Sequence, residues 1–167
     1  MALAAACSGP PGAGLLRGED LGDFRIDASQ QSNDCGAGAL GEAQEFDFQV
    51  QLSSLPPEFF WDARAAGRLS GDDFSVETRL RVTVREARGE TAGCSVSRLD
   101  TITGTLERDD EGAVVALSGA MTYAFGSGPA AECSAADIVE AGLERLPCAM
   151  SYALAGLRSR APERPAE

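Results

Sequence analysis

The chain of 167 residues contains neither lysine nor histidine, so all 14 of its basic residues are arginine. Without histidine, the sequence excludes a Ser-His-Asp or Cys-His nucleophile system and zinc sites that need imidazole ligands. Without lysine, it excludes Schiff-base chemistry and a Walker-type phosphate loop. No cofactor or metal motif replaces them, and we predict that the protein is not an enzyme.

Basic charge is also scarce relative to acidic charge, because 26 acidic residues give the chain a formal net charge of -12. A surface of this sign repels polyphosphate, so nucleic acid is not an expected partner. No apolar run reaches the length of about 18 residues that a membrane-spanning helix needs. The composition therefore predicts no membrane-spanning helix, so attachment to a membrane would require an anchor.

Such an anchor is suggested by the first residues, Leu3-Ala4-Ala5-Ala6-Cys7, followed by Ser8-Gly9-Pro10-Pro11. This run resembles the lipobox of bacterial lipoproteins, in which the cysteine is diacylated and becomes the mature N-terminus. The resemblance implies that Cys7 carries a lipid and that the protein is exported and held in the cell envelope. In a double-membraned bacterium it implies the outer membrane, because Ser8 is not an aspartate retention signal. The alternative is an irregular Ala/Gly-rich terminus with an incidental thiol.

The remaining chain is long enough for one domain of about 135 residues. Residues 1–7 are interpreted as the remnant of an export signal, and the Gly- and Pro-rich residues 8–22 as a flexible tether. Residues 23–158 are predicted to form a single β domain. Residues 159–167 are predicted to be a disordered tail.

Apart from Cys7, the chain has four cysteines: Cys35, Cys94, Cys133 and Cys148. An even number in an exported chain implies two disulfides, for which three pairings are possible. We favour Cys133 with Cys148, because they bracket a predicted short helix, which leaves Cys35 with Cys94. The wide spacing without a CxxC pair argues against zinc.

Alternation of apolar and polar residues predicts antiparallel strands across the domain. The expected strands are residues 24–28, 46–52, 59–69, 74–85, 94–107, 113–125 and 148–158. Within 74–85 the predicted core side carries Phe74, Val76, Leu80, Val82 and Val84, and within 113–125 it carries Val115, Leu117, Met121, Tyr123 and Phe125. Hairpin turns are indicated at residues 70–73 and 108–112.

One helix is predicted over residues 135–146, capped by Ser134 and ended by Pro147. The fold class is therefore all-β, an antiparallel up-and-down meander of about seven strands, barrel-like or a sandwich, with one short helix before the last strand. Three glycines inside predicted strands, Gly104, Gly119 and Gly156, are interpreted as devices that bend the sheet.

Candidate binding residues are aromatic. A closed meander loosely resembles the lipocalins in architecture, and a barrel of about eight strands is either filled by side chains or holds one ligand. Tyr123 and Tyr152 are expected inside it. In the cluster Phe59-Phe60-Trp61, neighbouring side chains on a strand face opposite ways, so at least one leaves the core side and becomes a candidate for ligand entry or for an interaction.

Acidic residues offer two further hypotheses. A carboxylate hydrolase using Glu45, Asp47 or Asp62 would need two of these groups in one cleft within about 10 Å. The acidic turns at residues 72–73 and 109–111 lack the alternating spacing of a calcium loop, which favours solvated hairpin tips.

Three functions follow in order of preference. The first is a non-catalytic, lipid-anchored envelope domain that displays loops to a protein or surface partner. The second is a lipocalin-like carrier of a small apolar ligand, and the third is the hydrolase. An internal cavity of roughly 300 Å³ or more would favour the carrier, and a filled interior would favour the display domain.

Overall fold

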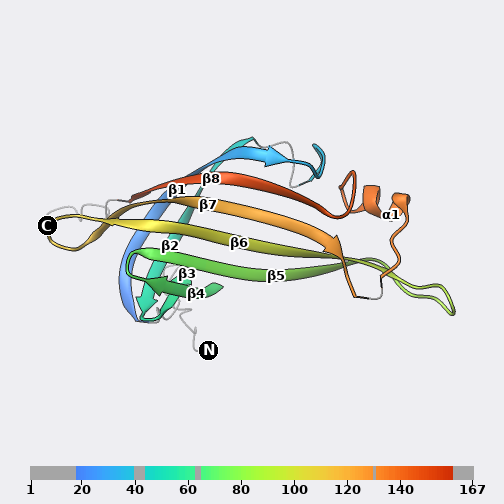
Figure 1. The fold of residues 1–167 in the computed structure, drawn as a ribbon, viewed down its shortest axis with the longest axis horizontal. Coiled ribbons are helices and arrows are strands. Elements are labelled where there is room, and N and C mark those ends of the chain that lie inside the picture. Colours follow the sequence, from blue (N-terminus) through green and yellow to red (C-terminus); the bar gives the residue numbers. More distant parts are fainter. Residues whose placement is uncertain (1–17, 40–43, 63–64, 130, 160–167) are drawn as a thin grey trace, which may run out of the picture.

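The computed structural model describes residues 18–39, 44–62, 65–129 and 131–159, which form an eight-stranded antiparallel barrel and one short helix (Figure 1). The strands are β1 (Glu19–Asn33), β2 (Glu45–Leu55), β3 (Glu58–Trp61), β4 (Ala65–Ser70), β5 (Asp73–Arg85), β6 (Cys94–Arg108), β7 (Val114–Ser127) and β8 (Cys148–Arg158). The helix is α1 (Ala135–Glu140). No helix in these ranges has the length and apolar character needed to cross a membrane.

The strands follow one another around the barrel in chain order, which confirms the predicted meander. Closure comes from β1 and β8, which pair from Phe24 opposite Arg158 to Asn33 opposite Met150. The expected single strand at 59–69 is two strands, β3 and β4, which pair with each other from Trp61 opposite Ala65. The barrel therefore has eight strands where the sequence predicted about seven.

The first strand is longer than the alternation predicted. β1 begins at Glu19, inside the range 8–22 interpreted as tether, and Glu19 pairs with Ser54 of β2. Cys7 and residues 160–167 lie outside the described residues, so the anchor and the tail stay predictions.

The helix begins where the sequence predicted and ends earlier. The hydroxyl of Ser134 accepts a hydrogen bond from the backbone N–H of Asp137, and the carboxylate of Asp137 accepts one from the N–H of Ser134 at 2.7 Å. This reciprocal cap fixes the start of α1. α1 stops at Glu140, well short of residue 146, because Gly142 adopts a φ of 76° that ends the helical path.

One end of the barrel is tightly packed, with buried Phe24, Ile26, Leu52, Phe59 and Phe74 in its interior. Two of the glycines predicted to bend the sheet, Gly104 and Gly156, make room for these side chains. Gly104 and Gly119 face each other across β6 and β7, and a Cβ on Gly104 would lie 2.7 Å from Cζ of Phe74. A Cβ on Gly156 would lie 2.6 Å from Cδ1 of Ile26.

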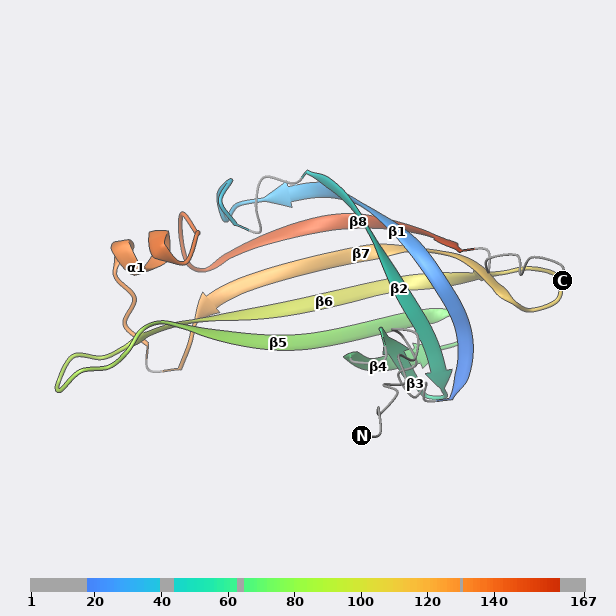
Figure 2. The ribbon, with the colours of Figure 1, turned by 180° about the vertical axis from the view of Figure 1, so that it is seen from behind.

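The other end of the barrel is open along one side. β4 pairs with β5 only as far as Val76, so within the described residues the rest of β5 has a partner on the β6 side alone. Figure 2 shows β2 running away from β5 beyond the short β3–β4 hairpin. Leu80 and Val82, predicted to be core residues, are therefore 50% and 63% exposed. They keep the inward side of β5, but no described strand pairs with this part of β5 on its β4 side.

A second core prediction is wrong at the start of β7. The pairing of β6 with β7 shifts between Glu107 and Arg108, so that Arg108 lies opposite Val114 and Glu107 opposite Ala116. The irregularity turns Val114 inward, where it is 2% exposed, and leaves Val115 39% exposed. A β-bulge reverses the alternation that the sequence displays.

Both disulfides form, but the favoured pairing is wrong: Cys35 bonds to Cys148, and Cys94 bonds to Cys133. Cys35 follows β1 and Cys148 begins β8, so the ladder that closes the barrel brings these two residues together. The segment before α1 runs back along the start of β6, where the N–H of Gly128 donates to the carbonyl of Ser95. Cys133 thereby reaches Cys94.

Candidate ligand-binding site

An ion pair lies on the inner side of β6, among apolar neighbours. The Nε and Nη2 groups of Arg98 donate to the two carboxylate oxygens of Asp100 at 2.6 and 2.7 Å. The side chains are 25% and 14% exposed. The guanidinium also lies 5.0 Å from the ring centre of Tyr123 on β7, a cation–π contact. Two half-buried charges therefore stand inside the open end of the barrel.

On one side of this pair lies a cavity of about 290 Å³, which we call the aromatic cavity. Asp100, Phe46, Phe48, Trp61, Tyr123 and Met121 contribute to its wall. The rings touch one another around it: Phe46 and Phe48 are stacked with centres 5.9 Å apart, and the centre of Trp61 lies 6.4 Å from that of Phe48. β2, β3 and β7 thus build an aromatic wall.

On the other side of the pair lies a second cavity of about 290 Å³, the aliphatic cavity. Arg98, Leu80, Val82, Val84, Phe125 and Leu143 contribute to its wall. Its far edge is formed by Glu140 and Ala141 at the end of α1. The two cavities and the ion pair between them are called the trough below.

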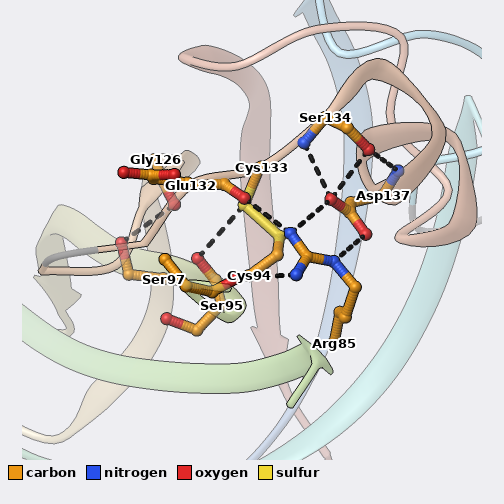
Figure 3. Close-up of a disulfide and its surroundings, with 10 residues drawn as sticks. Arg85, Cys94, Ser95, Ser97, Gly126, Glu132, Cys133, Ser134 and Asp137 are labelled. Atoms are coloured by element: carbon orange, nitrogen blue, oxygen red, sulfur yellow. Dashed lines mark hydrogen bonds and ion pairs between the residues drawn. A yellow bond between two sulfur atoms is a disulfide. The ribbon is translucent and has the colours of Figure 1, made fainter. Parts of the chain in front are cut away.

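The aliphatic cavity depends on the position of α1, which a polar cluster at the ends of β5 and β6 fixes (Figure 3). Arg85 donates from Nε to Asp137 at 3.1 Å, from Nη1 to the carbonyl of Ala92 at 2.6 Å, and from Nη2 to the carbonyl of Glu132 at 2.8 Å. The adjacent Cys94–Cys133 disulfide ties the same segment covalently. The hydrogen bond from Arg85, together with those from Ser134, lowers the pKa of Asp137 to about 2.

Polar groups in the wall of the aromatic cavity are partly shielded from water. Burial raises the pKa of the Tyr123 hydroxyl, and the nearby carboxylate of Asp100 raises it further. Next to Tyr123, the ring of Tyr152 meets it edge-on with centres 6.1 Å apart. The hydroxyl of Tyr152 accepts a hydrogen bond from the amide of Gln30 at 3.1 Å.

Two of the five predicted aromatic binding residues, Trp61 and Tyr123, line the aromatic cavity. Tyr152 is 2% exposed and packs behind it against Phe46. Phe59 is fully buried in the closed end. Phe60 is the residue of the cluster that leaves the core side, but it is only 4% exposed, so the expected exposed aromatic is absent. Its cross-strand neighbour Ser53 is 1% exposed, which shows that this outer face is covered.

Of the acidic hydrolase candidates, Glu45 and Asp47 both line a pocket of about 500 Å³ beside β1 and β8. Asp47 lies on the outer face, where its carboxylate is 3.3 Å from a guanidinium nitrogen of Arg25. At the hairpin tips, Asp72 accepts a hydrogen bond from Arg108 at 2.7 Å, and Asp109 accepts from the N–H groups of Glu111 and Ala113. The Asp72 bond joins two hairpin tips, and the Asp109 bonds hold its own turn together.

One group in the described part of the chain brings potential metal ligands together: Asp34, Cys35 and Cys148. The two sulfurs are bonded to each other, so they have no thiolate to offer a metal. Asp34 accepts hydrogen bonds from the N–H of Ala149 and from Arg145, and these lower its pKa. The group is a structural junction beside the barrel closure.

The ion pair was missed at the sequence level, although the sequence carries a signal for it. In residues 94–107 the inward positions include Val96, Arg98, Asp100 and Ile102. Two opposite charges on the apolar side of an alternating strand are unusual, because buried charges are rare unless they are paired. That pattern predicts an internal ion pair.

The comparisons with known proteins add no relationship: no family model matches the chain, and neither curated proteins nor solved structures give a match.

Proposed function

We propose that this protein is a non-catalytic binding protein of an extracytoplasmic compartment, which holds a small, mainly apolar ligand in the trough. The observation that carries the proposal is the Arg98–Asp100 pair, set between two cavities of about 290 Å³ each. Each volume is close to the lower limit for small-molecule sites. We prefer the carrier hypothesis to the display domain that the sequence alone favoured, because the interior contains these two cavities, each slightly smaller than the criterion of roughly 300 Å³.

A barrel needs neither the ion pair nor the exposed apolar side chains of the trough for its stability. A half-buried ion pair contributes little to stability, because the desolvation of both charges offsets their attraction. Exposed inward-facing Leu80 and Val82 leave apolar surface in water. A ligand with an apolar body and one polar group would cover the exposed apolar side chains and contact the ion pair.

The compartment is inferred from the two disulfides, which persist in oxidising environments. Anchoring through a diacylated Cys7 is part of the proposal. The intact mass of protein expressed with its natural upstream sequence in a bacterial host tests it: a diacylglyceryl addition at Cys7 supports the anchor, and an unmodified thiol contradicts it.

Ligand binding is tested by titration with phenylnaphthylamine, an uncharged fluorescent probe of apolar sites. We expect saturable binding that Val82→Glu weakens about tenfold, because it places a charge in the aliphatic cavity. Val139→Glu is the matched control, since Val139 is 69% exposed and lines neither cavity. Absence of saturable binding, or equal loss in both variants, would contradict the proposal.

Display of loops to a partner remains the second candidate. It is favoured by the β5–β6 connection, residues 86–93, which extends beyond the end of the barrel (Figure 1).

A further inference from the structure

We propose that the aromatic cavity recognises a small organic cation, a quaternary ammonium or protonated amine group, through its rings and the carboxylate of Asp100. This inference rests on the proposed function and names the polar group of the ligand. Of the described residues that line the cavity, Asp100 alone is charged. Four aromatic side chains also line it: Phe46, Phe48, Trp61 and Tyr123.

Aromatic walls suit this class of ligand. The face of each ring carries negative electrostatic potential, which attracts a cation without the strong hydration that a carboxylate requires. One ring of the wall already makes such a contact, since the guanidinium of Arg98, which borders the neighbouring cavity, lies 5.0 Å from the ring centre of Tyr123. The desolvation that raises the pKa of Tyr123 also strengthens charge interactions in the cavity.

Asp100 retains capacity for a hydrogen bond from a protonated amine, and its charge attracts a quaternary ammonium group, which has no N–H to donate. Each carboxylate oxygen accepts up to two hydrogen bonds, and Arg98 supplies one to each. Arg98 borders the aliphatic cavity and Asp100 the aromatic cavity. The carboxylate therefore faces the aromatic cavity, while the guanidinium borders the aliphatic cavity and contacts the Tyr123 ring. The net charge of -12 also attracts cations to the protein from a distance.

The test compares three probes of the same shape and different charge: choline, its neutral carbon isostere dimethylbutanol, and the anionic isostere dimethylbutyrate. Trp61 is the single tryptophan of the chain and lies in the cavity wall, so its emission reports binding directly. We expect choline to bind about tenfold more tightly than dimethylbutanol, with dimethylbutyrate weakest.

Two variants separate the contributions of charge and rings. Asp100→Asn should reduce the preference for choline over dimethylbutanol to about threefold or less, whereas Asp47→Asn, the same charge change on the outer face, should leave it unchanged. Phe48→Leu keeps an apolar wall without a π face and should lower choline binding while dimethylbutanol binding persists. The second variant keeps the test decisive if Asp100→Asn does not fold.

Equal binding of choline and dimethylbutanol, or tighter binding of dimethylbutyrate, would overturn the cation assignment and leave ligand binding in place. A choline preference that Asp47→Asn reduces as much as Asp100→Asn would also overturn it, because general surface charge would then explain the preference. Failure of all three probes overturns it as well. In that case the titration with phenylnaphthylamine decides separately whether the trough binds any ligand.

Discussion

Arg98 and Asp100 stand two residues apart on the same side of β6 and form a two-point ion pair inside a mainly apolar trough. Replacing both with apolar residues of similar size, Arg98→Met with Asp100→Leu, should leave the free energy of unfolding within about 1 kcal/mol of the unmodified protein or raise it. Asp100→Leu alone should cost about 2 kcal/mol, because it leaves the guanidinium unpaired. Urea titrations measure these differences. A large loss in the double variant would show that the pair has a structural role.

The Gly104–Gly119 contact gives a second prediction, which concerns the packed end of the barrel. Gly104→Ala should lower the free energy of unfolding by about 1–3 kcal/mol, because the new Cβ would lie 2.7 Å from the ring of Phe74 and 2.3 Å from the carbonyl oxygen of Ser118. Gly126→Ala is the matched control: its Cβ would meet only the hydroxyl of Ser97, at 3.7 Å. Thermal unfolding measures both, and equal losses would contradict the packing role of Gly104.

Much of the fold could be predicted because strand alternation is a local property. β5 and β8 were predicted within a residue of their observed bounds, and Ser134 was identified as the cap of α1. Alternation shows which side of a strand a residue faces, but it does not show whether another strand stands opposite. Leu80 and Val82 therefore face inward as predicted and remain exposed.

Long-range geometry was the part that could not be predicted. Cys35 and Cys148 meet only because the first and last strands pair, and nothing near either residue encodes that closure. The trough arises in the same way, from the shortness of β3 and β4 relative to their neighbours. Trp61 and Tyr123 are predicted as binding residues because they are aromatic, and closure of the barrel places both in the wall of one cavity.

The disulfide pairing gives a third prediction, which peptide mapping under non-reducing conditions checks. We expect peptides that link Cys35 to Cys148 and Cys94 to Cys133. Removing the second bond with Cys94→Ala and Cys133→Ala should cost about 4 kcal/mol in the chain-entropy model, given its sequence separation of 39 residues. A link between Cys133 and Cys148 would contradict the strand arrangement around α1.

The carboxylate of Asp137 gives the last prediction, a dependence of stability on acid. Its pKa is about 2 in the folded protein, below the ordinary value of 3.8. Because the folded pKa is depressed, the ionised carboxylate stabilises the fold fully above pH 3.8, and this contribution is lost as the pH falls toward 2. Asp137→Asn should therefore be less stable than the unmodified protein at neutral pH, and the difference should shrink across that window.

Urea midpoints measured at several acidic pH values test this dependence. Asp110→Asn removes one negative charge from the exposed tip of the β6–β7 turn and serves as the control for net charge. Because the carboxylate of Asp137 holds Arg85 and accepts the N–H of Ser134 at the start of α1, its loss should also loosen the wall of the aliphatic cavity and weaken phenylnaphthylamine binding. A difference between Asp137→Asn and the unmodified protein that stays constant over the acidic range would show that ionisation of Asp137 does not stabilise the fold.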